Sequence, residues 1–389
     1  MFPERFSNLP DYAFPRLRSL LDGIPPGGDE IAMTIGEPTH PFPQWVGGVI
    51  SDNLAGFNRY PPNPGSDGLL DAIRGWIARR YSVPEPAAMA LNGTREGLYN
   101  AAMALCPETK GGQQPVILSP NPFYQVYMVA ALSIGAEPVF VDATEATGHL
   151  PDYASLPEDI LNRAAVAYIC SPANPQGAVA DRDYWKTLLA LAERYDFKIF
   201  ADECYSEIYR GDAPTGVLTV AHEVGADPER VVLFNSLSKR SNLPGLRSGF
   251  VAGGPESIKR MGQLRNYAGA PLPLPLQAVA ERAWRDEAHV EANRALYAVK
   301  YALADEILGD IPGYRSPQAG FFLWLPVEDG EAATVRLWRE TGVKVLPGGY
   351  LAQGTGPANP GRGYIRVALV AAEDDTRRGL SALRQCLYD

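Results

Sequence analysis

Residues that bind metal ions or form disulfides are scarce in this sequence. The 389 residues include four cysteines and four histidines, and no two cysteines form a C-x-x-C pair. Cysteines this few and this widely spaced are typical of reduced thiols, so we expect a cytoplasmic protein. No H-E-x-x-H motif is present, and the sequence therefore predicts no metal site. With so few histidines, lysine is the better candidate for a catalytic base.

An excess of basic residues and long apolar stretches are also missing. The formal net charge is -10 at pH 7, which argues against nucleic acid or an anionic membrane as the main partner. No apolar run approaches the length of a membrane span, and the stretch MFPERFSNLP at the start lacks the apolar core of a signal peptide. The remaining composition, 46% hydrophobic and 21% charged residues, is typical of a globular protein whose length suits two domains.

Reactive side chains are concentrated in the stretch SLSKRSNLPGLRSGF, residues 236–250. Ser236 and Ser238 directly precede Lys239, and Arg247 follows it eight residues later. The apolar run at 231–234, just before the stretch, predicts a buried strand. A lysine condenses with an aldehyde only as the free amine, and desolvation or a neighbouring cation favours that form. The hydroxyls and Arg247 can also bind an anion. The stretch therefore predicts a site for an aldehyde that carries a phosphate, and pyridoxal phosphate is such a molecule.

Two alternatives exist for this stretch. One is a surface turn after a strand, without a catalytic role. The other is a serine acyl enzyme, because Ser236-Leu-Ser-Lys239 matches the S-x-x-K motif of penicillin-binding proteins. That class also carries S-D-N and K-T-G after this motif. Here Ser51-Asp-Asn53 precedes it and K-T-G is absent, so the lysine hypothesis is favoured.

Strands and helices alternate through the first part of the chain. Apolar runs predict strands at 31–35, 87–91, 115–118, 137–142, 164–170 and 198–201, and helical periodicity predicts helices at 66–81, 94–105, 125–134 and 182–195. This order predicts a mostly parallel sheet with helices on both faces. In such sheets, ligands bind beyond the carboxyl ends of the strands. Polar residues that follow strands are expected to converge at that edge: Asn92, Tyr124, Asn174, Asp202 and Lys239.

Two loops and the C-terminal part complete the predicted organisation. Asn92 or Thr94 is expected to cap the helix that continues to about 105, and the glycine turn at its start is a candidate anion site. The Pro- and Asn-rich segment 57–65 predicts an irregular binding loop. After prolines at 271, 273 and 275, a long helix is expected from 277 to 308. Strands at 321–324, 343–346 and 364–369 alternate with helices and predict a separate α+β domain.

Several motifs occur together: NGTREGL, SPANPQG, DECY and SLSK, with Arg247 eight residues after Lys239 and Arg366 near the end. With them the chain resembles the class I/II aminotransferases of pyridoxal-phosphate fold type I over nearly its full length. Within that family it is most similar to N-succinyldiaminopimelate aminotransferases, on the stretches GEPTHPFP, PNPFYQVY, DECYSEIY, SLSKRSNLPGLRSGFVAG and VLPGGYLA. The resemblance implies an α/β fold with a large cofactor-binding domain at 45–275, built on a mostly parallel sheet of the seven-stranded type. It also implies a small α+β domain, made of 1–44 and 276–389, that closes over the substrate.

The resemblance also assigns catalytic roles. Lys239 would bind the cofactor aldehyde and then move protons between the substrate Cα and the cofactor C4′. Asp202 would pair with the pyridine nitrogen and keep it protonated, or else cap a helix. Tyr205 and Asn174 would hydrogen-bond to the cofactor 3-oxygen, although Asn174 could equally form a turn. Tyr124 would lie against the ring, where the alternative is a core aromatic.

The phosphate and the substrate are assigned in the same way. The resemblance implies that the phosphate is held by the backbone of Thr94 and Arg95, by Ser236, Ser238 and Arg247, and by Tyr60 reaching in from a neighbouring subunit, so that the active unit is a homodimer. Arg366 would clamp the substrate α-carboxylate as a bidentate pair. Without the family, a strand arginine on a solvated face is the better interpretation. The backbone at Gly36 would approach the same carboxylate.

The implied reaction moves an amino group between an amino acid and a 2-oxo acid such as 2-oxoglutarate, with N-succinyl-LL-diaminopimelate of lysine biosynthesis as the candidate donor. Arg59, Asn63 and Arg265 lie in or near loops that could bind its distal end. The apolar segment PLPLPLQ at 271–277 favours an aromatic or aliphatic amino acid instead. Another reaction of the same cofactor, such as that of a C–S β-lyase, is a further alternative. A non-catalytic binding or regulatory relative is disfavoured, because the catalytic residues are all present.

Overall fold

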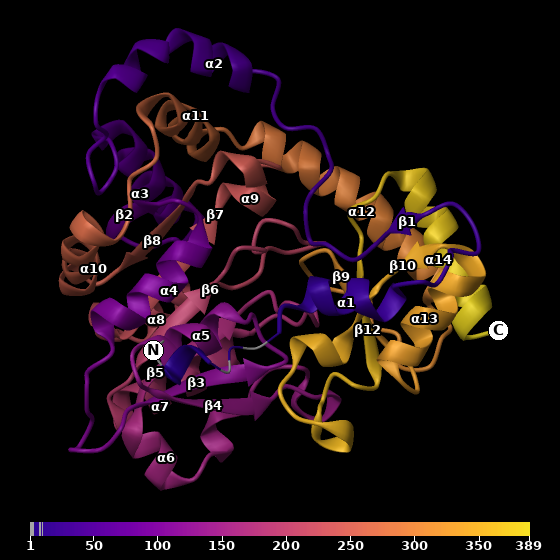
Figure 1. Cartoon of the computed structure of the whole chain (residues 1–389). Coiled ribbons are helices and arrows are strands. Elements are labelled where there is room, and N and C mark those ends of the chain that lie inside the picture. Colours follow the sequence, from indigo (N-terminus) through magenta and orange to yellow (C-terminus); the bar gives the residue numbers. More distant parts are fainter. Residues whose placement is uncertain (1–3, 8, 10) are drawn as a thin grey trace.

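A seven-stranded sheet forms the centre of the structure, a computed structural model that describes residues 4–7, 9 and 11–389 (Figure 1). Its strand order is β2-β8-β7-β6-β5-β3-β4. Neighbouring strands from β7 to β4 are parallel, whereas β8 runs antiparallel to both of its neighbours, so the expected mostly parallel sheet is confirmed. The strands are β2 (Ala87–Leu91), β3 (Val116–Asn121), β4 (Glu137–Asp142), β5 (Ala164–Cys170), β6 (Lys198–Asp202), β7 (Val231–Ser236) and β8 (Gly249–Gly253).

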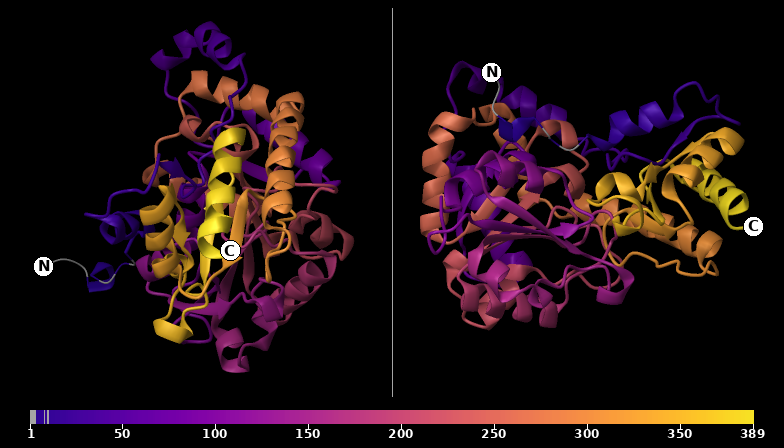
Figure 2. Two further views of the ribbon diagram at one scale, coloured as in Figure 1. Left: turned by 90° about the vertical axis from the view of Figure 1, so that its right-hand side faces the viewer. Right: turned by 60° about the horizontal axis from the view of Figure 1, so that its bottom comes forward.

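Helices cover both faces of this sheet (Figure 2). Successive strand residues point to opposite faces, and β6 accordingly gives Ile199 and Ala201 to one apolar core and Phe200 to another. The first core also contains side chains of α3 (Asp67–Tyr81), α7 (Arg182–Tyr195), α8 (Val217–Glu223) and α11 (Leu274–Arg285). The second contains side chains of α4 (Thr94–Leu105), α5 (Val126–Ser133) and α10 (Pro255–Ala268). The shorter helices α2 (Val46–Asp52) and α6 (Glu158–Arg163) lie at the periphery in Figure 1.

A smaller antiparallel sheet of three strands, in the order β11-β12-β9, forms a second centre. Its apolar core includes side chains of α12, α13 and α14, and α1 packs beside it on Trp338 and Leu346. The strand β1 pairs in parallel with β10, so the N-terminal segment joins the C-terminal part of the chain. The elements are β1 (Ile31–Ala32), β9 (Phe322–Pro326), β10 (Val343–Lys344), β11 (Leu346–Pro347), β12 (Tyr364–Ala368), α1 (Ala13–Leu21), α12 (Ala288–Leu308), α13 (Gly330–Thr341) and α14 (Glu373–Leu387).

The helix expected from 277 to 308 is divided in two, which corrects the prediction. Asp286 has an extended backbone between α11 and α12. Its Oδ1 accepts a hydrogen bond from the backbone N–H of Ala288 at 3.0 Å, and its Oδ2 accepts one from the indole N–H of Trp45 at 3.1 Å. A short acidic side chain that binds a nearby backbone N–H competes with the helical hydrogen bond. The chain therefore ends one helix there and begins another.

Predictions at the start of α4 and around β3 are also corrected. Neither Asn92 nor Thr94 caps α4, because its N-cap is Gly93, with φ of 84°. The strand β3 continues to Asn121 instead of ending at 118, since residues 119–121 pair with β4. In the segment 57–65, the first two residues end a 3-10 helix, η2 (Leu54–Asn58).

None of the helices in the described part of the chain combines the length and the apolar composition that a membrane crossing requires.

The carboxyl ends of β5, β6 and β7 lie at one edge of the large sheet. β5 ends four residues before Asn174, β6 ends at Asp202, and β7 ends at Ser236, where the single turn α9 (Leu237–Arg240) begins. Because the three strands are parallel neighbours, their carboxyl ends are adjacent. The sheet thus brings together polar residues that are far apart in the sequence.

Candidate active site

A cavity of about 280 Å³ lies at this carboxyl edge, and Arg366 of the small sheet also faces it. All of the predicted site residues except Tyr60 line it: Gly36, Thr94, Arg95, Tyr124, Asn174, Asp202, Tyr205, Ser236, Ser238, Lys239, Arg247 and Arg366. The predicted convergence of polar residues is therefore observed. The remaining lining residues include Tyr12, Phe14, Ile35 and Leu351, none of which was a predicted site residue.

Lys239 lies on α9, directly after β7. Its position is fixed by Ser236, whose Oγ caps α9 by accepting from the backbone N–H of Ser238 at 3.1 Å. The amine Nζ donates a hydrogen bond to the carbonyl of Gly36. Burial, assisted by the cations Arg366 and Arg247, lowers the pKa of Lys239 to about 8. The nucleophilic free amine is therefore more populated near neutral pH than it is for an exposed lysine.

Asp202 ends β6 and is 5% exposed. Its Oδ2 accepts a hydrogen bond from the hydroxyl of Tyr127 at 2.9 Å, and its Oδ1 accepts one from the backbone N–H of Cys204 at 3.4 Å. Burial raises the pKa of Asp202, whereas the hydrogen bonds from Cys204 and Tyr127 act in the opposite direction. No helix in the described residues begins at this position, so the alternative role of Asp202 as a helix cap is wrong.

Tyr127 is a site residue that the sequence analysis missed. It lies three residues after Tyr124, on α5, and is fully buried. Residues three apart on a helical turn lie on the same side, so the spacing in PNPFYQVY was a usable signal. Burial raises the pKa of Tyr127 well above its ordinary value. The phenol therefore stays protonated and donates a hydrogen bond to Asp202.

One end of the cavity is built for an anion. The N-terminus of α4 opens there at Thr94, and free N–H groups of a first helical turn attract negative charge. A Cβ atom at Gly93 would lie 2.2 Å from Nη2 of Arg247, so only glycine allows this guanidinium to approach. Two hydroxyls lie at the same wall, with Oγ of Ser236 2.9 Å from Oγ of Ser238.

Arg247 itself has an unusual backbone. Its φ is 58°, in the left-handed region that non-glycine residues seldom adopt. Its Nη1 donates to the carbonyl of Pro244 at 2.8 Å and its Nη2 to the carbonyl of Asn92 at 3.3 Å. The guanidinium is thereby directed toward the start of α4, although the conformation of its own backbone is unfavourable.

Arg366 lies on β12 and is 4% exposed, so its interpretation as an arginine on a solvated face is wrong. Nη1 donates to Oδ1 of Asn174 at 2.9 Å and Nη2 donates to the carbonyl of Thr34 at 2.7 Å. The buried Nε has no hydrogen-bond partner within the described residues. Burial lowers the pKa of Arg366 to about 10. A buried cation with an unsatisfied donor is suited to a carboxylate ligand.

Gly36 and Asn174 line the part of the cavity next to Arg366. A Cβ atom at Gly36 would lie 2.5 Å from the ring of Phe322, so a side chain is excluded and the backbone is exposed to the cavity. Asn174 is more than a turn former, because its Oδ1 accepts from Arg366. Its amide Nδ2 is the atom that remains to donate to a ligand.

The side chain of Arg95 adds a third guanidinium to the cavity wall. Sequence analysis had assigned only its backbone. Its Nε donates to the hydroxyl of Tyr124 at 2.7 Å, and Tyr124 and then Tyr12 raise the pKa of Arg95. In the described part of the chain, no carboxylate contributes to this shift or forms an ion pair with Arg95. The apolar residues Phe14 and Leu351 also line the cavity, and neither was a predicted site residue.

Tyr60 lies outside this cavity with its side chain fully exposed, at 101%. The residues considered for a distal substrate group do not line the cavity of the same subunit. Arg265 is 3% exposed, donates to the carbonyl of Ala90 and lies 3.7 Å from Glu96, so it stabilises the fold around β2. The segment 271–277 also lies outside the cavity and packs below the loop that precedes Tyr60.

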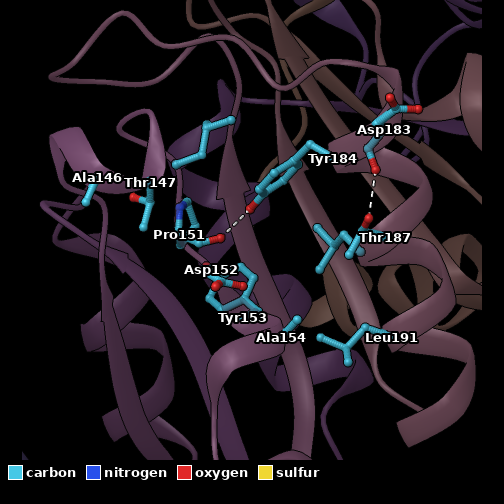
Figure 3. Close-up of a pocket in the computed structure, with 12 residues that line it drawn as sticks. Ala146, Thr147, Pro151, Asp152, Tyr153, Ala154, Asp183, Tyr184, Thr187 and Leu191 are labelled. Carbon is cyan, nitrogen blue, oxygen red and sulfur yellow. Dashed lines mark hydrogen bonds between the residues drawn. The ribbon is translucent and has the colours of Figure 1, made fainter.

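A second cavity of about 430 Å³ lies between the loop 146–154 and α7, and none of the predicted site residues lines it (Figure 3). The hydroxyl of Tyr184 donates to the carbonyl of Pro151 at 2.8 Å across it. Its carboxylates, Asp152 and Asp183, are exposed to solvent. It contains no buried charged side chain among its described lining residues, in contrast to the cavity at Lys239.

The chain is similar to known proteins over almost its entire length. The family model for aminotransferase class I and II matches residues 29–383. An LL-diaminopimelate aminotransferase of Desulforudis audaxviator is 31% identical, over 99% of this chain and 97% of its own length. One from Dehalococcoides mccartyi is 30% identical, over 98% and 97%. Among solved structures, an aminotransferase of Neisseria meningitidis Z2491 is 37% identical with a TM-score of 0.93, covering 99% of each chain.

We expect the reactivity of Lys239 toward a small aldehyde to rise as the pH increases through about 8, because only the unprotonated amine attacks. Reductive methylation with formaldehyde, followed by peptide mass spectrometry, gives the rate at each pH. In Arg366→Gln the midpoint should move upward, since a neighbouring cation that disfavours the ammonium is lost. A wild-type midpoint near the ordinary lysine value of about 10.4 would contradict this account of the site.

Proposed function

Because this chain belongs to the class I and II aminotransferases, which depend on pyridoxal phosphate, we propose that it takes the amino group from a long-chain amino acid with a distal carboxylate. The enzyme moves an amino group between an amino acid and a 2-oxo acid, and we propose 2-oxoglutarate as the acceptor. A donor of the diaminopimelate type is supported by the relatives that are named LL-diaminopimelate aminotransferases. The resemblance of motifs to N-succinyldiaminopimelate aminotransferases adds the succinylated form as a second candidate donor.

The residues at the anion end fit the phosphate of the cofactor. The backbone N–H groups of Thr94 and Arg95, the hydroxyls of Ser236 and Ser238, and the guanidinium of Arg247 would hold it. The missing side chain at Gly93 supports this role, since any Cβ there would displace Arg247. When bound, pyridoxal phosphate supplies an aldehyde that takes up the amino group and a ring that accepts electrons when the substrate Cα loses its proton.

The central residues would act on protons. Lys239, as a free amine, would bind the cofactor and later carry a proton to and from the substrate Cα. Asp202, oriented by Tyr127, would hold the proton of the ring nitrogen. Asn174 through Nδ2 and Tyr205 through its hydroxyl would donate to the ring oxygen, because burial keeps the phenol of Tyr205 protonated by raising its pKa well above the ordinary value. Tyr124 would lie against the ring.

Arg366 would bind the α-carboxylate of the substrate. Its unpaired buried Nε and its fixed contacts to Asn174 and Thr34 support this role, because a preoriented guanidinium binds a carboxylate through two parallel hydrogen bonds. The backbone of Gly36, open to the cavity, would approach the same group. Arg366 and Gly36 would thus orient the substrate so that its amino group lies next to Lys239.

The observation that carries the substrate class is the guanidinium of Arg95. Arg247 and Arg366 would bind the phosphate and the α-carboxylate, whereas Arg95 lies on the cavity wall, donates to the hydroxyl of Tyr124 and forms no ion pair within the described residues. A cation at such a wall is complementary to a second carboxylate. The apolar side chains Phe14, Ile35 and Leu351 would contact the aliphatic spacer between the two acidic ends.

A second candidate donor is an aromatic or aliphatic amino acid. The same wall of Tyr12, Phe14, Ile35 and Leu351 favours it, because an apolar side chain gains free energy when it leaves water. The two candidate donors differ at Arg95. A distal carboxylate would form an ion pair with its guanidinium, whereas an apolar side chain would form none.

We propose a homodimer whose active sites are shared between subunits. Exposed aromatic side chains support it, because Tyr60 is 101%, Tyr267 93% and Phe57 55% exposed in the isolated chain. Exposed apolar side chains that gather on one surface are typical of a protein interface. Tyr60 would then reach the phosphate end of the neighbouring cavity.

We also propose that residues 45–275 form the large domain and that 1–44 together with 276–389 form the small one. The pairing of β1 with β10 supports this division, since it joins the N-terminal segment to the C-terminal part. The packing of α1 on Trp338 and Leu346 supports it as well.

We expect Asp202→Asn to slow proton removal from the substrate by several orders of magnitude, because the ring nitrogen loses its proton holder. Tyr127→Phe should lower the same rate about tenfold, because it removes the hydrogen bond that orients Asp202. Single-turnover absorbance with bound cofactor measures both rates, and thermal melts exclude unfolding. Equal rates in wild type and Asp202→Asn would contradict the role of Asp202.

The substrate class is tested by kcat/KM for LL-diaminopimelate, its N-succinyl derivative, glutamate, phenylalanine and leucine, with 2-oxoglutarate as acceptor. We expect the diaminopimelates to be preferred. Arg95→Gln should reduce kcat/KM for them about tenfold to a hundredfold and leave leucine nearly unchanged, because one charge-assisted pair is lost. Arg260→Gln, at an exposed position of α10, is the matched control. A preference for phenylalanine or leucine would reject the distal-carboxylate proposal and leave the aminotransferase activity intact.

Mixed dimers test the shared site. Tyr60→Phe and Lys239→Ala chains should each be weakly active alone, because each change affects both sites of its own homodimer. When the two are mixed, one site of each hybrid should be free of both changes, and part of the wild-type activity should return. Differently tagged subunits establish that exchange has occurred. Exchange without any recovery of activity would count against the shared site.

A further inference from the structure

A polar cluster lies behind Lys239 that the proposed function does not use. It consists of His40 on the segment 36–41, Asn242 on the loop after α9, and Asn293 on α12. Oδ1 of Asn293 lies 2.9 Å from Nδ1 of His40 and accepts from Nδ2 of Asn242 at 3.0 Å. Nδ2 of Asn293 donates to the backbone carbonyl of Lys239 at 3.4 Å. Asn242 and Asn293 are 8% and 3% exposed, so these contacts are made away from water.

Two backbone carbonyls fix the orientation of both amides. Nδ2 of Asn242 also lies 3.3 Å from the carbonyl of Pro41, and Nδ2 of Asn293 faces the carbonyl of Lys239. Turning either amide would place an oxygen against a carbonyl oxygen. Oδ1 of Asn293 therefore points at His40, which must present its Nδ1–H as a donor.

This cluster links the segment 36–41 to the backbone of Lys239. The segment also accepts the Lys239 amine on the carbonyl of Gly36, so it contacts this residue at both its side chain and, through Asn293, its main chain. α9 has only four residues, and the backbone N–H groups of Ser241 and Leu243 both donate to the carbonyl of Leu237, not to that of Lys239. Asn293 supplies a donor for the carbonyl of Lys239.

The same segment is fixed to the side of the cavity where Arg366 lies. The hydroxyl of Thr39 and Nζ of Lys300 both donate to the carbonyl of Val370. Just before the segment, the carbonyl of Thr34 accepts from Nη2 of Arg366 at 2.7 Å. The carboxylate-binding guanidinium and the reactive amine are thus connected to one short stretch of chain.

We propose that His40, Asn242 and Asn293 are positioning residues that hold the main chain of Lys239 in register with the segment 36–41. The inference rests on the proposed function, in which Lys239 is the cofactor-binding amine and Arg366 with Gly36 binds the substrate carboxylate. Through the cluster, the carboxylate-binding end and the proton-transferring amine keep a fixed relation while the substrate is bound.

Two variants separate the two arms of the cluster. Asn293→Ala removes both the support of Lys239 and the partner of His40, so kcat should fall about tenfold and KM for the amino donor should rise about threefold to tenfold. His40→Phe releases the segment 36–41, and KM for the amino donor should rise about threefold to tenfold. His40→Gln, which can still donate to Oδ1 of Asn293, should keep KM for the amino donor close to the wild-type value. His222→Gln, at an exposed position of α8, controls for the loss of an imidazole.

A measurement on cofactor-free protein separates positioning from mere stability. With formaldehyde and a reductant, labelling of Lys239 at pH 8 should be about threefold slower in Asn293→Ala and His40→Phe, because water entering beside the amine favours the ammonium. Both variants should melt as single transitions. Lower melting temperatures with wild-type labelling rates, kcat and KM would overturn the inference. A wild type that binds no cofactor at Lys239 would instead reject the proposed function itself.

Discussion

Removal of charge from water at the carboxyl edge of the large sheet is the constraint on which the rest of the site depends. Lys239 and Asp202 each lie where burial opposes the charged form, and each has only a few fixed polar neighbours. Transfer of a charged group from water into a protein costs free energy unless partners replace the solvent. The parallel strands reduce this cost because their carboxyl ends are adjacent. Polar and charged side chains that follow the strands can therefore contact one another within one cavity.

The cavity also depends on contacts between segments that are remote in the sequence. Arg366 on β12 reaches Asn174 after β5, and the carbonyl of Gly36 accepts the amine of Lys239. Neither the large sheet nor the small sheet contains a complete site. A change in the packing of the two sheets against each other would therefore alter the geometry of the cavity, since Lys239 follows β7 of the large sheet and Arg366 lies on β12 of the small sheet.

The positions of residues that follow strands could be predicted from the sequence. The positions of residues whose role depends on where the side chain points could not. A residue such as Asp202 can be predicted because an apolar run ends beside it and the topology then places it. Arg265, in contrast, lies near the end of α10 but is buried against β2, and no local pattern indicates that its guanidinium turns inward. The break between α11 and α12 was missed for a similar reason, because one carboxylate, that of Asp286, competes with an otherwise continuous helical pattern. Tyr127 could have been found from its spacing to Tyr124.

The reaction and the substrate are specified by different parts of the chain, and this explains why the first is easier to infer. Groups assigned to the cofactor lie at strand ends or at the start of α4, where backbone geometry fixes them and leaves a motif in the sequence. The wall that would face the substrate side chain comes from Tyr12, Phe14 and Leu351, in segments whose packing requires only apolar character. Such positions can exchange one apolar residue for another at little cost in stability. Specificity can therefore change while the fold and the chemistry stay the same.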